Sequence, residues 1–391
     1  MRIVLTGATG LLGRNLLFEI LKRNLNHLDS LELFVLGRNN KEVTISQRIQ
    51  RILSGDGYLY IGIDPESQKA KEINSSIKCI SMNLDHHKLN MDPQDYEILK
   101  SKPIDVFFHV AACTDFRDTP NVVEMLKVIN VEGTRHILEL IDTLDVKELC
   151  FTGTAYSCGK TYGKIRTDYI NLAQEFRNPY ERSKLEAELL VREYSKKSGL
   201  KCKYFRPSTI AGRLMEKPHG AVNKFDVFYS WAAFFLYLKT KQLNKIDYET
   251  PTKIDLRICY SMNSGLNIVP SDYAAKIMYE VHLNGTPEET YYLVNEKETP
   301  HHMYIPVMLN TIKVTGVDRV AEIPKDMNHL EKIYYKTVGK IFTPYINTDP
   351  TEFDLSNLEP IFKRSGITCP NVGKDEFTAL IDFAKQYNFG M

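Results

Sequence analysis

A glycine-rich turn near the N-terminus constrains the fold of this chain more than any other feature. The apolar run Ile3-Val4-Leu5 leads into TGATGLLG over residues 6–13, and the segment 11–21 then has the pattern of a helix. Glycine permits a tight turn, close approach of the backbone to a pyrophosphate and close packing of a helix on a strand. The helix N-terminus adds unpaired N–H groups and a partial positive charge. This order predicts a dinucleotide site at Gly7, Thr9, Gly10, Leu11, Leu12 and Gly13, although a glycine turn without a ligand would have the same spacing.

Short apolar runs and helical patterns alternate through the first half of the 391 residues. We expect strands at 33–36, 77–81, 105–110, 148–152 and 202–205, and helices at 45–53, 122–144 and 180–197. Such alternation predicts an α/β fold, a doubly wound parallel-sheet Rossmann domain with right-handed crossovers. After Pro207 the rhythm breaks, and no strand is expected directly after the aromatic helix near Trp231. We therefore expect a nucleotide-binding domain over 1–212, with late elements returning around 260–296, and a smaller, mostly helical, interleaved substrate lobe over 213–391.

Composition excludes several classes of protein. The 50 Lys and Arg nearly cancel the 49 Asp and Glu, so no basic excess points to nucleic acid. The 7 cysteines are scattered without paired spacing, which predicts no disulfide framework and no metal site, and favours a reducing cytoplasm. Met1-Arg2 leads directly into an apolar strand, so we expect no signal sequence, and the apolar stretch 227–238 is shorter than the roughly 20 residues that span a bilayer. We expect a cytoplasmic protein without a membrane span.

The end of the second strand indicates which dinucleotide is bound. NAD sites place an acidic residue there for the ribose 2′-hydroxyl, whereas arginine suits the 2′-phosphate of NADP. The chain reads Gly37-Arg38-Asn39-Asn40 at this point, and Arg48 follows in the next helix. Solvated surface arginines would give the same sequence, but the lack of an acid favours NADPH, held by Arg38 and Arg48.

Three residues form a candidate catalytic group. Tyr180 and Lys184 have the spacing Y-x-x-x-K, which places a phenol and an ammonium about one turn apart on one helix face. A cation close to a phenol favours the phenolate and lowers a pKa that is ordinarily near 10. Thr154 lies just after the strand 148–152, at the sheet edge where ligands bind, and its hydroxyl can bond a reacting carbonyl oxygen. A chance Tyr/Lys pair is common on helices, but the addition of Thr154 favours catalysis.

Together these motifs resemble the extended short-chain dehydrogenase/reductase superfamily. The similar stretches are residues 6–13, 109–112 and 130–134, with Thr154, Tyr180 and Lys184. Residues 151–156, 178–188, 267–273, 344–345 and 353–354 are most similar to the branch of thioester reductases and fatty acyl-CoA reductases. The resemblance implies cofactor contacts at Asn83, Leu84, Ala111, Ala112, Asn130, Thr152, Tyr180, Lys184, Pro207 and Ser208. The chain departs from the family pattern at Met82-Asn83-Leu84, where G-D-L is usual, and at Gly153, where Ser is usual.

The resemblance also implies a reaction. NADPH would deliver hydride to the carbonyl of an acyl thioester, while Tyr180 protonates the oxygen, Thr154 bonds it and Lys184 lowers the phenol pKa. Loss of the thiol would leave an aldehyde, and a second hydride would give an alcohol. The thioester would be carried by CoA or by an acyl or peptidyl carrier protein acting in trans, in secondary-metabolite or lipid biosynthesis.

Alternatives remain at this point. A nucleotide-sugar epimerase or reductase has the same fold, and a non-catalytic NADP-binding regulator would keep the cofactor site alone. The apolar helix 227–238 is either buried core or one wall of an acyl channel. The lysines that flank it either face solvent or meet an acidic carrier or a phosphopantetheine phosphate; they are Lys217, Lys224, Lys239, Lys241 and Lys245. The acyl group and the oligomeric state are open.

Overall fold

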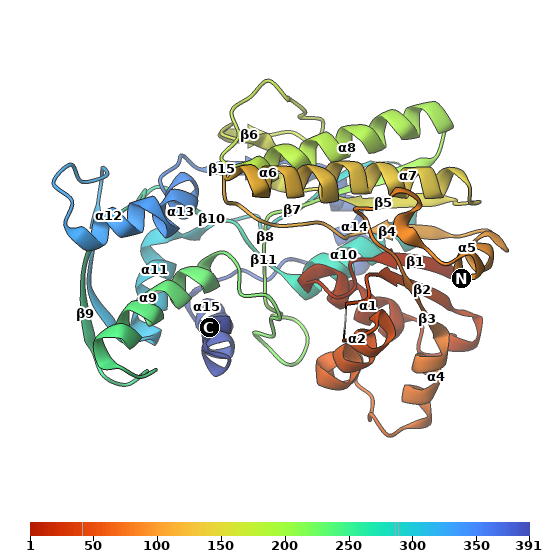
Figure 1. Ribbon diagram of the computed structural model, residues 1–391, viewed down its shortest axis with the longest axis horizontal. Coiled ribbons are helices and arrows are strands. Elements are labelled where there is room, and N and C mark those ends of the chain that lie inside the picture. The colour runs from red at the N-terminus through yellow and green to blue at the C-terminus, as the bar shows by residue number, and fades with distance from the viewer. Residues whose placement is uncertain (41, 286, 288) are drawn as a thin grey trace.

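A computed structural model of the chain describes residues 1–40, 42–285, 287 and 289–391, and its centre is a parallel sheet (Figure 1). The sheet has 7 strands in the order β12-β7-β5-β4-β1-β2-β3, and all neighbours are parallel. Its strands are β1 (Arg2–Thr6), β2 (Glu32–Gly37), β3 (Ile77–Ser81), β4 (Val106–His109), β5 (Glu148–Thr152), β7 (Lys201–Pro207) and β12 (Thr290–Leu293). The expected doubly wound α/β fold is confirmed.

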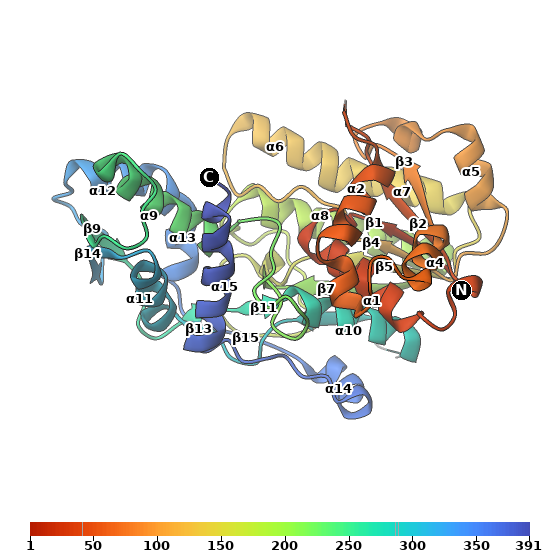
Figure 2. The same cartoon turned by 90° about the horizontal axis from the view of Figure 1, so that it is seen from below.

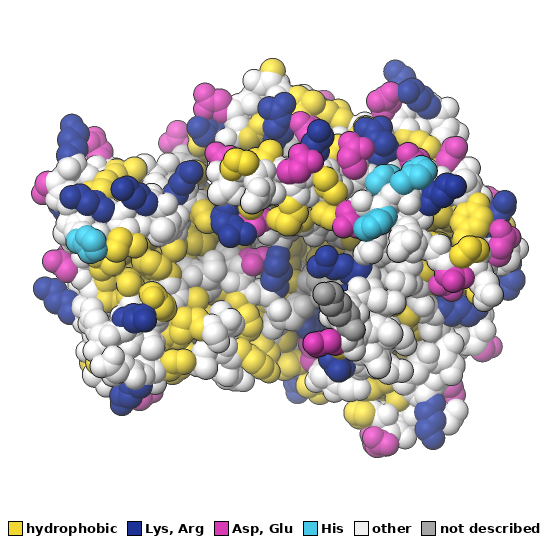
Figure 3. Space-filling view, in the orientation of Figure 1, with side chains coloured by type: hydrophobic (Ala, Val, Ile, Leu, Met, Phe, Trp, Pro, Cys, Tyr) yellow, Lys and Arg dark blue, Asp and Glu magenta, His cyan; other side chains and the backbone are white. Residues whose placement is uncertain are grey.

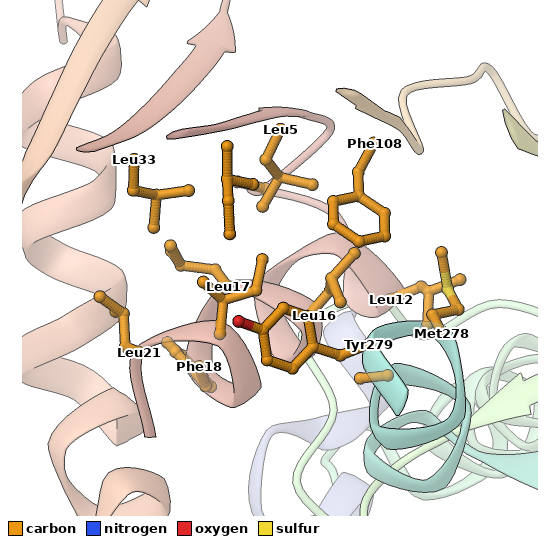
Figure 4. Close-up of a cluster of buried hydrophobic side chains, with 14 of the residues drawn as sticks. Leu5, Leu12, Leu16, Leu17, Phe18, Leu21, Leu33, Phe108, Met278 and Tyr279 are labelled. Carbon is orange, nitrogen blue, oxygen red and sulfur yellow. The ribbon is translucent and has the colours of Figure 1, made fainter. Parts of the chain in front are cut away.

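The continuously apolar strands are explained by helices on both faces of the sheet. Along β1, Ile3 and Leu5 face one hydrophobic cluster and Val4 faces another, as the two-residue period of a strand requires. The first face is covered by α1 (Leu11–Arg23) and α10 (Ser271–Asn284), whose side chains meet those of the strands in Figure 4. The opposite face is covered by α5 (Pro93–Lys100), α7 (Gly133–Asp142) and α8 (Pro179–Ser198).

The strand order reverses direction at β1, and this reversal positions the site. From β1 the chain proceeds outward to β2 and β3, then returns to β4 on the other side of β1. In a doubly wound sheet the connections that follow these two strands run in opposite directions. They leave a crevice beyond the carboxyl ends of the two strands, and ligands bind there. The helices α2 (Ile45–Ile52), α3 (Tyr58–Ile61) and α4 (Gln68–Ser76) complete the β2–β3 connection.

The helix expected at 122–144 is present but divided. The structure has α6 (Pro120–Leu126), then a π-helical segment, η4 (Lys127–Glu132), and then α7. Another π-helical segment, η2 (Leu53–Gly57), follows α2. A π turn holds one more residue than an α turn, and such turns occur often at functional sites. The π-helical segment η4 contains Asn130, one of the residues of the site described below.

Most of the remaining elements gather in a C-terminal group, to the left of the sheet in Figures 1 and 2. The carboxyl ends of the strands point to this side, because β1 starts near the N-terminus on the right. Trp231 and Phe235 of α9 (Phe228–Leu243) are fully buried in the core of the group. Its other helices are α11 (His301–Thr311), α12 (His329–Lys336), α13 (Val338–Ile346) and α15 (Lys374–Gln386). The aromatic helix α9 is therefore part of a buried core, which is one of the two interpretations drawn from the sequence.

The C-terminal group also contains a two-stranded parallel ribbon, which was not predicted. The expectation of no strand directly after the aromatic helix was wrong, because β9 (Thr252–Cys259) follows α9 and pairs with β14 (Val314–Val320). Residues 252–256 alternate between buried and exposed positions, the pattern of a half-covered strand. Shorter elements are β6 (Gly163–Ile165), β8 (Thr209–Ala211), β10 (Gly265–Leu266), β11 (Ile268–Pro270), β13 (Thr299–Pro300), β15 (Thr351–Phe353) and α14 (Glu359–Ser365).

Two late elements, α10 and β12, return to the sheet as expected: α10 packs against α1, and β12 pairs with β7. The division of the chain at residue 212 remains a prediction. Among the described residues, no helix combines the length and the apolar character that crossing a membrane requires.

Candidate cofactor and catalytic site

The glycine turn has the geometry that a pyrophosphate needs. Gly7 has φ +78°, and a Cβ there would lie 2.6 Å from the backbone nitrogen of Ala111. A Cβ on Gly13 would lie 2.1 Å from the carbonyl oxygen of Gly7, so only glycine allows α1 to pack this close to the turn. Gly10 is the N-cap of α1, and no side chain caps the helix. The first N–H groups of α1 are therefore available to an anion.

A buried hydrogen-bonded chain fixes the turn against the loop after β4. The Thr6 hydroxyl oxygen accepts hydrogen bonds from the backbone nitrogens of Val110 (3.1 Å) and Ala111 (3.2 Å), and lies 2.9 Å from His109 Nδ1. His109 Nε2 lies 3.3 Å from the hydroxyl of Thr134. Burial, aided by the positive charge of Lys184, lowers the pKa of His109 to about 3, so the imidazole is neutral. Sequence reasoning assigned no role to His109.

Two arginines lie together beyond the end of β2. Arg38 is exposed, and Arg48 donates a hydrogen bond from Nη1 to the Arg38 carbonyl oxygen at 3.2 Å. Burial and the neighbouring charge of Arg38 lower the pKa of Arg48. Within the described part of the chain, neither guanidinium has a carboxylate partner. Two positive charges without a counter-ion fit a phosphate, as the sequence predicted for NADP.

The three candidate catalytic residues meet at the carboxyl end of β5. Asn178 caps α8 by accepting a hydrogen bond from the Glu181 nitrogen, and Pro179 opens the helix, so Tyr180 lies in its first turn. The Thr154 hydroxyl lies close enough to the Tyr180 phenol to oppose the rise in the pKa of Tyr180 that burial causes. Thr154 is buried and donates to the carbonyl oxygen of Pro207 at 3.3 Å. This arrangement holds a phenol beside a second hydroxyl, as expected for a proton donor.

The effect of Lys184 differs from the expectation. Its ammonium is buried and lies 4.8 Å from the centroid of the Phe151 ring. Burial lowers the pKa of Lys184 to about 8, against the opposing effect of Glu188. Burial and the negative charge of Glu181 raise the pKa of Tyr180. We expected Lys184 to lower the pKa of the phenol, but this lowering is not found, because burial dominates the pKa of both groups. A phenol that keeps its proton can still act as a proton donor.

Asn130, whose cofactor contact stays a prediction, makes hydrogen bonds within the protein. It is buried, and its side-chain oxygen accepts a hydrogen bond from the Cys113 nitrogen at 2.8 Å. Its nitrogen donates to the Cys113 carbonyl and to the Ser183 hydroxyl, both at 3.0 Å, and Ser183 donates to the Tyr180 carbonyl at 2.8 Å. Both amide hydrogens are thus used within the protein. Asn130 links the loop after β4 to the first turn of α8.

The remaining predicted residues lie at the same edge of the sheet. Asn83 and Leu84 follow β3, while Ala111 and Ala112 follow β4, where Ala111 faces Gly7. Thr152 ends β5, and its buried hydroxyl has no hydrogen-bond partner in the structure. Pro207 ends β7, and the adjacent Ser208 donates to the Asn267 side chain at 2.7 Å. The unpartnered hydroxyl, the bare glycine turn and the arginine pair together fit a dinucleotide.

An aromatic cluster contacts the ring of Tyr180 through Phe116. The rings of Phe116 and Tyr180 have centroids 5.3 Å apart, and Tyr345 of α13 lies 6.1 Å from Phe116 and 5.4 Å from Tyr156. The Tyr345 hydroxyl donates to the buried Glu181 carboxylate at 2.7 Å. The C-terminal group is thereby attached to the first turn of α8. The sequence resemblance included residues 344–345, but it gave no sign of this contact.

The loop that leads into α9 lies over the glycine turn. The side chain of Asn223 donates to the Thr9 carbonyl at 3.2 Å, and Lys224 donates to the Thr114 hydroxyl while pairing with Asp226 at 2.6 Å. Figure 3 shows a hollow between the sheet and the C-terminal group, with Lys and Arg side chains in it. Lys239 is not among the exposed lysines, because it is buried and donates to the Ile312 carbonyl at 2.9 Å. It cannot meet a carrier protein.

Comparison with known proteins gives the family. The family model described as Male sterility protein matches residues 5–278. Fatty acyl-CoA reductase 1 of Rattus norvegicus is 30% identical over 156 residues, which are 40% of this chain and 28% of that protein. The Homo sapiens protein of the same name is 29% identical over the same length. The matched segment is thus less than a third of the length of these relatives.

Solved structures with the same fold include two reductase domains. The terminal R domain from the myxalamid PKS-NRPS pathway has a TM-score of 0.72 and 20% identity, covering 100% of this chain and 91% of that one. A thiolation-reductase di-domain from an archaeal non-ribosomal peptide synthetase has a TM-score of 0.66 and 17% identity, covering 100% and 76%. UDP-glucuronic acid 4-epimerase from Bacillus cereus has a TM-score of 0.60 and 16% identity, covering 99% of each chain. At such identities the likeness concerns the fold alone.

The glycine turn at the switch of a doubly wound sheet defines an NAD(P)-binding protein of the extended short-chain dehydrogenase/reductase fold. The chain belongs to the Male sterility protein family, whose model matches most of its length. The expected resemblance to the fatty acyl-CoA reductases is confirmed at the level of the family. The solved thioester reductase domains share its fold.

Proposed function

We propose that this protein uses NADPH to reduce an acyl thioester to an aldehyde or an alcohol. The observation that carries the proposal is that Thr154, just after β5, lies beside the phenol of Tyr180 in the first turn of α8. Lys184 follows one turn further along the helix, at the edge of the sheet that bears the glycine turn. The match of the family model over residues 5–278 supports the same class of reaction. The arginine pair at the end of β2 supports NADPH over NADH.

Each residue of the group has a distinct part in the proposed reaction. When bound, the nicotinamide supplies the hydride. Tyr180 holds its proton at neutral pH, as a phenol ordinarily does, and burial raises its pKa further; it gives this proton to the carbonyl oxygen as negative charge develops there. Thr154 then turns its hydroxyl proton from the Pro207 carbonyl to the same oxygen, which stabilises that charge before the proton of Tyr180 arrives. Lys184 lies one turn behind Tyr180, where its ammonium can hold the ribose.

The surroundings of Tyr180 favour a thioester that approaches along an apolar path. Phe116, Tyr156 and Tyr345 form aromatic walls that exclude water from the reacting carbonyl. The exposed Lys224, beside the loop after β4, lies where a phosphate of CoA or of a carrier-bound phosphopantetheine could pass. We propose a carrier protein or CoA as the source of the thioester, and the cytoplasm as the place of the reaction.

A direct test compares substrates and products. Purified protein is mixed with NADPH and a panel of acyl-CoA, acyl-pantetheine and carrier-bound thioesters; loss of cofactor absorbance is followed, and products are identified by mass spectrometry. We expect turnover of at least one thioester and, for Tyr180→Phe, a loss of about 100-fold or more with NADPH binding retained. The matched control is Tyr194→Phe, which alters a tyrosine of α8 that bonds Asp142 far from the site. Turnover of a nucleotide sugar with NAD, and of no thioester, would refute the proposal.

A further inference from the structure

A group of metal-ligating side chains lies on α7 and the loop after β3, apart from the catalytic group. His87, His136 and Glu139 each present one ligand atom, and these atoms all lie within 4.8 Å of one another. Among the described residues this is the only such group of three or more His, Cys, Asp or Glu. His136 and Glu139 are three residues apart on α7, so they share one helix face. His87 Nδ1 lies 3.6 Å from the Glu139 carboxylate.

The ring of His136 is already oriented as a ligand. Its Nδ1 lies 2.8 Å from the carbonyl oxygen of Leu84. A carbonyl only accepts, so Nδ1 carries the proton of the neutral ring, and Nε2 presents its lone pair. Metal-bound histidines are held in this way, by a carbonyl or carboxylate on the other nitrogen. The Leu84 carbonyl is itself fixed, since Leu84 packs so tightly on α7 that a Cβ on Gly133 would lie 2.9 Å from its Cβ.

From this geometry we propose that His87, His136 and Glu139 form a binding site for Zn²⁺ or a similar divalent transition metal. Two imidazoles and one carboxylate are a ligand set that Zn²⁺ accepts, with water in a fourth position. Ligand atoms about 2.0–2.1 Å from a tetrahedral ion stand about 3.4 Å apart, so ligand atoms that lie up to 4.8 Å apart must approach by up to about 1.4 Å. The side chain of His87 is 74% exposed and free to make this movement. Mg²⁺, which prefers oxygen ligands, is not expected to bind.

The site connects α7 with the loop after β3, where the cofactor residues Asn83 and Leu84 lie. His87 comes from the 3₁₀ turn η3 (His87–Asn90), and the other two ligands come from the helix. A bound ion would therefore cross-link these two segments. It would stabilise the folded chain, because an ion that binds only the folded state raises the melting temperature.

The experiment is a metal titration of the full chain after removal of metal with a chelator. Calorimetry with Zn²⁺, visible absorption with Co²⁺ and the Tm with each ion are measured for the wild type and for His87→Ala, His136→Ala and Glu139→Gln. The control is His86→Ala, since the neighbouring exposed His86 pairs with Asp85 at 2.7 Å and lies outside the group. We expect one Zn²⁺ per chain, a rise in Tm, and binding at least tenfold weaker in each ligand variant and unchanged in the control.

His87→Ala keeps the test decisive if the other variants fold poorly, because its side chain is largely exposed. Unchanged Zn²⁺ affinity in His87→Ala would overturn the site. So would an equal loss in His86→Ala, or Mg²⁺ binding as tightly as Zn²⁺. These results do not depend on turnover, so the site and the proposed reaction can fail separately.

Discussion

Replacement of Arg38 by alanine tests how this protein distinguishes NADPH from NADH. A hydrogen bond to a charged group contributes about 1.5–3 kcal/mol, and the exposure of Arg38 argues for the lower end. A loss of about 1.5 kcal/mol raises the Kd for NADPH about tenfold. Arg48 is partly buried, so Arg48→Ala should cost about 2 kcal/mol, or about 30-fold.

The affinity for NADH shows whether the effect of each variant is specific to the 2′-phosphate. NADH lacks the 2′-phosphate, so we expect its Kd to change by less than about twofold in either variant. The double variant should lose more than the product of the single effects, because each single replacement also relieves the repulsion between the adjacent charges, and this relief offsets part of each single loss. Both constants are measured by fluorescence titration at one fixed salt concentration.

A matched variant separates a local contact from general loss of charge. Arg51 is exposed and lies in the same helix as Arg48, so Arg51→Ala removes one positive charge from α2. Its affinity for NADPH should stay within about twofold of the wild type, as for a screened surface charge. If Arg38→Ala weakens NADPH and NADH equally, or weakens neither, the assignment of Arg38 to the 2′-phosphate is wrong.

Three further changes test other parts of the site. Gly7→Ala should destabilise the fold by about 1–3 kcal/mol in denaturant unfolding, because of its positive φ and a Cβ only 2.6 Å from the Ala111 nitrogen; an unchanged midpoint would contradict this. Tyr345→Phe leaves the buried Glu181 carboxylate without one donor, so unfolding by urea should show a loss of about 1–3 kcal/mol, and full stability would show that the bond is dispensable. The pKa of His109 is about 3 in the folded chain against 6.5 when unfolded, so the unfolded state binds more protons between these values and stability falls as the pH drops from 6.5 towards 3. His109→Gln should flatten this part of the pH profile, measured by thermal unfolding, and an equally steep profile would assign the loss to other groups.

The parts of the fold that depend on local pattern could be predicted from the sequence. The strands at 77–81 and 148–152 have the expected bounds, because short apolar runs bounded by polar residues leave little choice of register. The glycine turn was also predictable, since its three glycines lie in one strand-turn-helix unit; the close approach of Ala111 to Gly7, from the loop after β4, was not. The residues of the catalytic group were found from spacing and resemblance together, and their roles remain predictions.

The other features depend on contacts between distant segments. The π turn at Asn130 follows from a hydrogen-bond network with Cys113 and Ser183, which no helical period reveals. The ribbon of β9 and β14 pairs strands more than 50 residues apart, and only the alternation in β9 gave a signal. The raised pKa of Tyr180 reflects burial by the whole site, whereas the spacing from Lys184 suggested the opposite direction.

The return of α10 and β12 to the sheet has a consequence for how the chain acquires its structure during synthesis. A ribosome from which only residues 1–212 have emerged has released β7 with an unpaired edge, and α1 without the helix that packs on it. Both surfaces are prone to association until Thr290–Leu293 has emerged. Fragments that end near residue 212 should therefore aggregate. The nascent chain should need chaperones until β12 has paired with β7.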